Sequence, residues 1–354
     1  MSEQRYRIAV IPGDGIGREV VPAALEVVHA AAQGEGFRLA CEEFPWCSDD
    51  YLRTGRMMPQ DALEQLRPFD AIFLGAVGSP EVPDHIPVWG LILPIRKGFD
   101  QYVNLRPMRL LPGIASPLAG RGPAEVDMVC VRENSEGEYS GLGERRHVGT
   151  PQEVAEQTSR FTRRGIERIV RYAFELAASR PRRQLASATK SNALQHSMVL
   201  WDEVVAEVAA EYPRVALASY HVDALAARMV SHPQTVDVIV ASNLFGDILT
   251  DLGAALSGSL GLGASGNINP AREFPSMFEP IHGSAPDIAG RGIANPIGAI
   301  WAGAMMLDHL GEAEAAGRVM AAIERVLEAG VARTPDLGGD STTEALAAAI
   351  RDAL

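Results

Sequence analysis

Short β-branched runs that alternate with helical patterns constrain the fold of this chain more than any other feature. Strand-like runs stand at residues 6–11, 70–75, 127–131 and 236–241, and helical patterns cover residues 18–32, 196–212 and 315–327. Strands separated by helices are typical of sheets whose strands run parallel, because each helix carries the chain back to the starting edge. The sequence therefore predicts an α/β protein with a largely parallel sheet.

Composition and charge narrow the classes of function. The 354 residues are 47% hydrophobic and 22% charged, which is the profile of an ordered protein with room for two domains. Lys and Arg number 32 against 45 Asp and Glu, and the net charge of −13 repels polyanions. We therefore expect no nucleic acid and no membrane among the partners. Since no apolar run is long enough for a signal-peptide core or a membrane span, we also expect a cytoplasmic protein.

The spacing of the glycines and cysteines argues against a dinucleotide fingerprint and against a zinc site. Gly13, Gly15 and Gly17 follow a strand and open a helix, but Arg18 stands where a dinucleotide fingerprint requires its last glycine. The motif predicts a strand-to-helix turn that borders a cofactor, and not a Rossmann fold. The 3 cysteines show neither a zinc spacing nor an even count, so we interpret them as small core residues.

Residues 258–296 are rich in Gly, Pro, Asn and Ser and show no strand or helix period. A segment of this length without periodicity is usually functional or disordered, and the apolar residues Phe274, Met277 and Phe278 argue against disorder. We interpret it as an ordered system of ligand-binding loops.

Paired carboxylates suggest a metal site. Asp247 and Asp251 stand four residues apart in a helical pattern, which places them on one helix face about 6 Å apart. Oxygen ligands of this kind suit Mg²⁺ or Mn²⁺, and Asp223, at the end of another strand-like run, is a candidate third ligand. A solvated acidic helix face is the alternative.

Several cationic and phenolic side chains stand near the ends of predicted elements. Arg96, Arg106 and Arg132 are candidates for binding carboxylates through a guanidinium fork, although each could equally form a surface ion pair. Lys190 is a candidate base and Tyr139 a candidate acid.

Taken together, these sequence motifs resemble those of one known family. Six segments resemble, in this order, the β-decarboxylating dehydrogenases, the family of isocitrate, 3-isopropylmalate, tartrate and D-malate dehydrogenases: IAVIPGDGIGREVV, NLRP, VRENSEGEYS, ATKSN, SNLFGDILTDL and PSMFEPIHGSAPDIAGRGIANP. The resemblance implies an isopropylmalate dehydrogenase-like fold of two domains. Residues 1–103 and 256–354 would form a large cofactor-binding domain, and residues 104–255 a small central domain that contains the dimer interface.

The resemblance also implies a role for each candidate residue. Arg96, Arg106 and Arg132 would bind the carboxylates of a small 2-hydroxy diacid, which is oxidised at C2 and then loses CO₂. Asp247 and Asp251 would hold Mg²⁺ or Mn²⁺ together with Asp223 of the other subunit of a homodimer. Lys190, also from the other subunit, would take the hydroxyl proton, and Tyr139 would protonate the enol. The active sites would thus be shared, and a monovalent cation is a further candidate cofactor.

The long loop indicates the nicotinamide cofactor. Asp287 and Ile288 resemble the pair found in NAD users, in which the carboxylate accepts hydrogen bonds from the ribose and repels a 2′-phosphate. We therefore expect NAD and not NADP. The cofactor contacts implied by the resemblance are Gly75, Glu279, His282, Gly283, Ser284, Ala285, Asp287, Ile288 and Asn295.

The helical segment before Arg96 indicates the substrate. The bulky Trp89 stands where larger-substrate relatives have a Glu, and Trp89 and Leu93 are the expected contacts to the substrate's C3 side. A bulky ring favours D-malate, converted to pyruvate and CO₂, with tartrate as a second substrate. Pro94 interrupts the helix and could move these contacts. The alternatives are a 3-isopropylmalate dehydrogenase of leucine biosynthesis and, from another class, a non-catalytic regulatory subunit; a metal-dependent hydrolase is the third.

Overall fold

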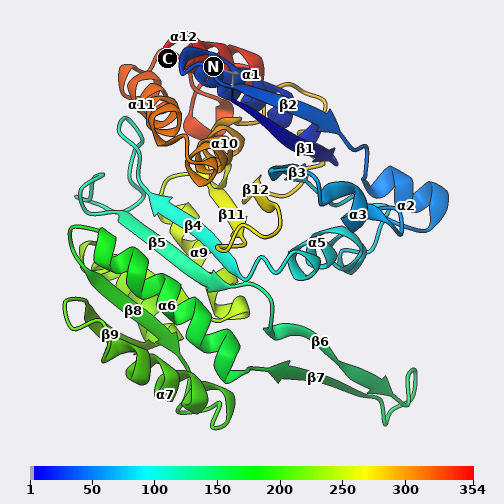
Figure 1. The fold of residues 1–354 in the computed structure, drawn as a ribbon, viewed down its shortest axis with the longest axis vertical. Coiled ribbons are helices and arrows are strands. Elements are labelled where there is room, and N and C mark those ends of the chain that lie inside the picture. The colour runs from blue at the N-terminus through cyan, green and yellow to red at the C-terminus, as the bar shows by residue number, and fades with distance from the viewer. Residues whose placement is uncertain (1–3) are drawn as a thin grey trace. The chain divides into compact units, whose positions relative to one another are not determined.

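The apolar run at residues 6–11 forms strand β1 (Arg5–Gly13), which lies inside the first of two units into which the chain divides. The computed structural model describes residues 4–354 (Figure 1). Unit 1 contains the chain up to residue 101 together with 109–123 and 254–354, and unit 2 contains residues 102–108 and 124–253. The α/β fold with a largely parallel sheet is confirmed.

Five strands of unit 1 lie side by side in the order β2 (Arg38–Glu43), β1, β3 (Ala71–Ala76), β12 (Ser276–Pro280) and β11 (Ala264–Ile268). All neighbouring pairs are parallel except β11 and β12. Successive side chains of a strand face opposite sides, and here both sides are buried. Ile8 and Val10 pack into one core, whereas Ala9 and Ile11 pack into the other. Burial on both faces explains why β1 is apolar without alternation.

Helices cover both faces of these strands. The helices of unit 1 are α1 (Gly17–Gly34), α2 (Ser48–Thr54), α3 (Ala62–Leu66), α4 (His85–Pro87), α5 (Leu93–Gly98), α10 (Ile297–Leu310), α11 (Ala313–Ala329) and α12 (Thr343–Asp352), with short turns at Leu260–Leu262 and Pro335–Leu337. The first core joins the sheet to α1, α10, α11 and α12, and the second joins it to the segment around Leu91, Ile95 and Phe99. Figure 1 shows α1, α10, α11 and α12 gathered beside β1 and β2.

The interpretation of residues 258–296 as loops is wrong for two stretches, since β11 and β12 lie within it and pair antiparallel. Every residue of both strands is buried, so no polar alternation marks them. Polar residues in β11 are satisfied internally: the Asn267 side-chain amide donates to the Glu279 carboxylate over 2.8 Å. Residues 281–296 form the irregular remainder, as expected.

The segment around Pro94 keeps a helical path. A π-helical turn (Val88–Ile92) follows α4 and leads into α5, and Pro94 lies in the first turn of α5. Proline fits this position because the first amide groups of a helix have no carbonyl partner within it. The expected interruption is therefore a change of helix type.

Unit 2 has its own five strands, in the order β4 (Val103–Arg109), β5 (Asp127–Glu133), β10 (Val238–Ala241), β8 (Gln184–Thr189) and β9 (Ala216–His221). The last four are parallel to one another. The helices are α6 (Arg163–Ser179), α7 (Ser197–Ala209), α8 (Val222–Ser231) and α9 (Asn243–Leu256), with a short turn at Pro233–Thr235. Strands β6 (Gly137–Arg146) and β7 (Val154–Arg160) form a separate antiparallel ribbon (Figure 1).

The predicted domains, 1–103 with 256–354 and 104–255, differ from the two units mainly at residues 109–123. This segment packs with unit 1 because Arg109 forms an ion pair with Glu324 and Leu111 joins the core of α1 and α11. The domain assignment itself stays a prediction. None of the helices in residues 4–354 combines the length and the apolar character that crossing a membrane requires.

Acid is expected to destabilise unit 1 through His309. Burial and, less strongly, the Arg272 cation lower the pKa of His309, which packs against Phe278, to about 4. The unfolded chain therefore binds this proton at a higher pH than the folded chain, and stability is lost as the pH falls from 6.5 towards 4. We expect a loss of about 2 kcal/mol between pH 7 and pH 5 from this group. Urea unfolding at both pH values checks it: the loss should shrink in His309→Phe, and an equal loss in the variant would contradict the assignment.

Candidate active site

The candidate catalytic residues of unit 2 gather at one edge of its sheet. Strands β5, β10, β8 and β9 are parallel, so their carboxyl ends share an edge. Arg132 lies at the end of β5, helix α9 with Asp247 follows β10, and Lys190 follows β8. Asp223 lies in the first turn of α8, which follows β9 directly. In open α/β sheets this edge is where ligands bind.

The Asp247 carboxylate is the centre of the first cluster. Its Oδ1 atom accepts hydrogen bonds from Arg132 Nη1 at 2.5 Å and Arg106 Nη1 at 3.2 Å, and its Oδ2 atom accepts one from the Tyr139 hydroxyl at 2.9 Å. Arg106 also donates to the Thr250 hydroxyl over 2.8 Å. Both arginines are buried, whereas the Asp247 side chain is 36% exposed. The cluster thus presents two fixed guanidinium groups beside an accessible carboxylate.

Burial and charge shift two pKa values in this cluster. Burial, reinforced by the Asp247 charge, raises the pKa of Tyr139, which keeps its hydroxyl proton available. Burial and the same Asp247 charge raise the pKa of Asp251. The two carboxylates therefore disfavour each other's charge, as expected for like charges one helical turn apart.

Lys190 and Asp223 form a second cluster at the same edge. Lys190 Nζ lies 2.6 Å from Asp223 Oδ1, and this hydrogen bond lowers the pKa of Asp223. Asp223 is more exposed than Lys190, with side-chain exposed fractions of 69% and 29%. Among residues 4–354 of a single chain, no group of three or more His, Cys, Asp or Glu side chains could hold a metal ion. The predicted three-aspartate site is thus not assembled within one chain.

The remaining predicted carboxylate-binding residue, Arg96 of unit 1, forms a buried ion pair. Its Nη2 atom lies 2.7 Å from Glu279 Oε1, and both side chains are less than 10% exposed. Among the residues described, Arg96 Nε and Arg106 Nε are buried without a hydrogen-bond partner. Each of these two arginines therefore retains a donor that a ligand carboxylate could use.

The two predicted C3-side contacts differ in exposure. Trp89 is 45% exposed, and Lys97 Nζ lies 5.1 Å from the centre of its ring. Leu93 is only 3% exposed and belongs to the interior of unit 1. Trp89 is therefore the available contact of the two.

The predicted cofactor residues of unit 1 fall into two sets. Asp287 and Gly283 are exposed, and His282 donates from Nδ1 to the Gly283 carbonyl over 3.0 Å. Burial lowers the pKa of His282, and its Nε2 atom is a buried acceptor without a partner among the residues described. The neighbouring loop is held in place by the Ser284 carbonyl, which accepts the Ile16 amide over 2.9 Å. The Asp287 carboxylate and His282 Nε2 are therefore the acceptors here that a nucleotide could use.

Two other predicted cofactor residues serve the fold in this structure. A Cβ atom at Gly75 would lie 2.3 Å from the Pro12 carbonyl oxygen, so glycine allows β3 to lie close to the end of β1. The Asn295 side chain accepts the Ile297 amide and donates to Asp336. Ala285, with φ of 41°, Ile288 and Glu279 complete the predicted set.

Sequence reasoning missed two buried polar residues that organise the site. Asp14 accepts hydrogen bonds from the backbone of Ser48 and Gly78, and so joins three loops of unit 1. The Asn243 side-chain oxygen accepts both Nε and Nη2 of Arg132, at 3.1 and 2.7 Å. The signal available was the position of each residue at a strand-to-helix connection: Asp14 directly follows β1, and Asn243 opens the helix after β10.

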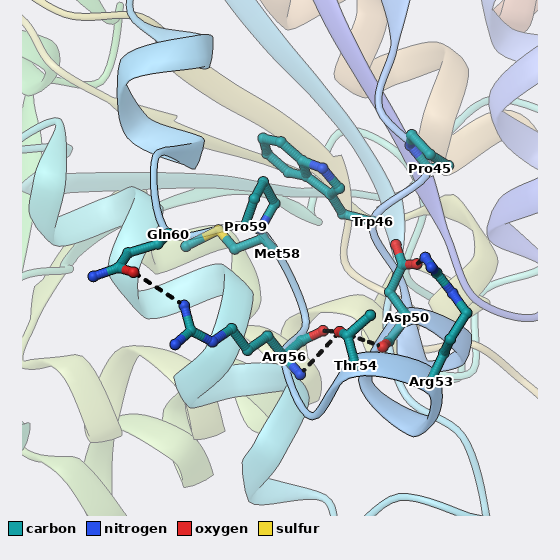
Figure 2. A pocket seen from close by; sticks show the side chains of 9 residues that line it. All are labelled: Pro45, Trp46, Asp50, Arg53, Thr54, Arg56, Met58, Pro59 and Gln60. Carbon is teal, nitrogen blue, oxygen red and sulfur yellow. Dashed lines mark hydrogen bonds and ion pairs between the residues drawn. The ribbon is translucent and has the colours of Figure 1, made fainter.

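A separate cavity of about 490 Å³ in unit 1 contains none of the predicted site residues (Figure 2). Trp46 and Met58 are among the apolar residues that line it, and Asp50 and Arg53, which form an ion pair, line it as well. Figure 2 shows Arg56 directed toward Gln60, with 3.4 Å between donor and acceptor. The polar groups of the cavity thus bond to one another.

Two buried arginines bonded to Asp247, at the carboxyl edge of a parallel sheet, are the kind of site that could bind a small acid. The model of the isocitrate/isopropylmalate dehydrogenase family matches residues 7–352. The chain belongs to this family and is an oxidoreductase, as the sequence predicted. Dehydrogenases of the family in general use NAD or NADP and a divalent metal.

Individual relatives give the same result over almost the full length. The chain is 56% identical over 352 residues to a probable tartrate dehydrogenase/decarboxylase of Agrobacterium vitis, covering 99% of this chain and 98% of the relative. It is 56% identical over 351 residues to the D-malate dehydrogenase (decarboxylating) of Escherichia coli, covering 97% of each. The structure resembles the isocitrate dehydrogenase of Methylococcus capsulatus, with a TM-score of 0.88, 38% identity and coverage of 98% and 99%. Since the named relatives are dehydrogenases, the regulatory-subunit alternative is set aside.

Proposed function

We propose that this oxidoreductase catalyses the oxidative decarboxylation of a small 2-hydroxy diacid, D-malate to pyruvate and CO₂, with tartrate as a second substrate, using NAD and Mg²⁺ or Mn²⁺. The observation that carries the proposal is the Asp247 cluster, in which Arg106, Arg132 and Tyr139 meet one carboxylate. The names of the relatives that are 56% identical support the substrate class.

Charge balance favours joint binding of a divalent cation and a dianion. Arg106 and Arg132 carry two positive charges beside the two negative charges of Asp247 and Asp251. A divalent cation together with a diacid adds no net charge to this cluster, whereas either one alone leaves a surplus in a partly buried site. Metal and substrate should therefore bind cooperatively.

Oxygen donors of the cluster fit a hard cation. Asp247 and Asp251 would hold the cation. Burial and the Asp247 charge raise the pKa of Asp251, and a cation bound between the two carboxylates would favour the charged form of both. When bound, such a cation polarises the hydroxyl and carbonyl oxygen of the substrate. We propose Asp223 of a second copy of this chain as the third ligand, which makes the functional protein a homodimer with shared sites.

The side chains of this chain supply the proton transfers. Arg106 and Arg132 orient the substrate carboxylates, because their buried guanidinium groups are already fixed. Lys190, as the neutral amine, takes the hydroxyl proton, and the Asp223 carboxylate, 2.6 Å from Nζ, holds the ammonium group that this step forms. Tyr139 donates its hydroxyl proton to the enol carbon after CO₂ leaves. The proposal keeps Arg96 as a further substrate contact and the exposed Trp89 ring as the feature that favours a diacid without a large C3 branch.

The fit to NAD depends on Asp287 and His282. Asp287 is exposed and offers carboxylate oxygens to ribose hydroxyls, and His282 Nε2 is a free acceptor among the described residues. When bound, the nicotinamide group would supply the acceptor for the hydride that leaves C2 of the substrate.

Replacing Asp287 with Lys should reverse the cofactor preference. The carboxylate repels a 2′-phosphate and an ammonium group attracts it, so kcat/KM with NAD should fall about 10- to 100-fold while that with NADP rises. Steady-state kinetics with both cofactors measures the change, with Asp308→Lys as a charge-matched surface control. A ratio unchanged from the wild type would remove Asp287 from the cofactor site.

Product stoichiometry tests the proposed reaction. Each D-malate consumed should yield one NADH and one pyruvate, measured by NADH absorbance and by enzymatic assay of pyruvate. NADH formed with accumulation of oxaloacetate instead would mean that oxidation occurs without catalysed decarboxylation, and the proposed role of Tyr139 would be lost.

A further inference from the structure

Glu138 contacts the start of the helix that carries both candidate metal ligands. Its Oε1 atom accepts the Ser242 hydroxyl over 2.8 Å, and its Oε2 atom accepts the Leu244 amide over 3.1 Å. Ser242 is fully buried and precedes α9, and its Oγ atom accepts the Phe245 amide over 3.4 Å. Glu138 therefore fixes the first turn of α9, where backbone amides have no partner within the helix.

Residues 136–139, at the start of β6, contact α9 at two further points. The Asn243 side chain donates to the Glu136 carbonyl over 3.3 Å, and the next side chain after Glu138, that of Tyr139, donates to Asp247 over 2.9 Å. One reacting group thus lies on β6 and its acceptor lies on α9. The bonds made by Glu138 set how these two elements are placed relative to each other.

Charge favours this arrangement as well. The amino end of a helix carries a partial positive charge, which the Glu138 carboxylate neutralises. Arg132 of β5 donates two hydrogen bonds to the side-chain oxygen of Asn243, the first residue of α9. The start of α9 is therefore held between β5 and β6, and Glu138 supplies a side-chain acceptor for the Leu244 amide.

We propose that Glu138 is a positioning residue for the reaction, acting through Tyr139 and Asp247 by fixing the first turn of α9 against β6. This inference rests on the proposed oxidative decarboxylation. Its geometric part, the anchoring of α9, stands independently of the substrate.

Glu136 provides a matched control on the same segment. Its carboxylate accepts the backbone amide and the hydroxyl of Thr162, each over 2.8 Å, and Thr162 caps α6. Glu136 therefore anchors a different helix with the same two kinds of bond. A purely structural role would give Glu136 and Glu138 variants the same behaviour.

The experiment compares Glu138→Ala, Glu138→Gln and Glu136→Ala in the full-length protein. Glu138→Ala loses the acceptor of the Leu244 amide, and Glu136→Ala loses the acceptor that holds the capping residue Thr162, so each melting temperature should fall by about 2–4 °C. For Glu138→Ala, kcat should fall about 10- to 100-fold with KM changed less than about threefold, because misplacement of reacting groups lowers turnover more than binding. Glu136→Ala should keep kcat within about twofold. Glu138→Gln retains an acceptor oxygen and an amide that can pair with Ser242, and should recover most of the activity.

Hydrogen exchange measured by mass spectrometry gives a readout independent of turnover. Amides of residues 243–247 should exchange faster in Glu138→Ala than in the wild type and in Glu136→Ala. Equal kcat in the two Ala variants, or unchanged exchange in residues 243–247, would overturn the positioning role. If the wild type itself oxidises no diacid, the proposed function fails, while the exchange result still decides whether Glu138 anchors α9.

Discussion

Asp247→Asn should lower kcat by about 10³-fold or more while the protein stays folded. The Asp247 carboxylate accepts hydrogen bonds from Arg106, Arg132 and Tyr139. Asparagine keeps the shape and one acceptor oxygen, so the arginines remain bonded, but the negative charge that a divalent cation needs is lost. Steady-state kinetics over a range of Mn²⁺ concentrations should show a higher metal requirement together with the lower kcat.

The control for this variant is Asp308→Asn, which removes the same charge at an exposed position of α10. It should keep kcat within about twofold, as ordinary surface substitutions do. Turnover of Asp247→Asn within the same range, at wild-type Mn²⁺ concentrations, would contradict the assignment of the cluster as catalytic.

Lys190→Ala should lower kcat by about 10²- to 10⁴-fold, because the base that takes the hydroxyl proton is removed. In the shared-site proposal Lys190 serves the Asp247 cluster of the partner chain. Mixing Lys190→Ala with Asp247→Asn under conditions that exchange subunits should then restore activity. Random pairing makes half of the dimers mixed, each with one intact site of two, so the mixture should reach about a quarter of the wild-type rate.

Two outcomes would contradict this account of Lys190. If Lys190→Ala alone keeps wild-type kcat, the lysine is not the base. The second outcome is that both variants are inactive and that their mixture stays inactive although subunit exchange is verified. The active site would then be complete within one chain, and Asp223 of the second copy would not be the third ligand.

Periodicity in the sequence was sufficient for the strands that are apolar on both faces. Residues 6–11 and 236–241 were predicted as strands, and β1 and β10 form there because their continuous apolar runs fit strands buried between helix layers. The strands β11 and β12 were missed because Ser265, Asn267 and Glu279 are polar residues in buried strands. Their burial depends on partners distant in the sequence, among them Arg96, which no local pattern reveals.

The candidate site, too, could be predicted from the sequence only in part. Asp247 and Asp251 were predicted to share a helix face from their spacing, and the Asp247 charge does reach Asp251. The meeting of Arg106, Arg132 and Tyr139 at Asp247 depends on the order of β4, β5 and β10 in the sheet, which the sequence does not encode locally. Glu138 and Asn243 were overlooked for a related reason, since a polar residue that caps a distant helix looks like any surface residue in the sequence.

The most direct test of the central claim is NAD reduction by purified protein with Mn²⁺, followed by NADH absorbance. The substrates to compare are D-malate, L-malate, the tartrates, isocitrate and 3-isopropylmalate, with the best one repeated in the presence of a chelator. We predict the highest kcat/KM with D-malate or a tartrate and its loss on chelation. A preference for 3-isopropylmalate would contradict the substrate assignment based on Trp89, and full activity in the presence of chelator would contradict the metal site at Asp247 and Asp251.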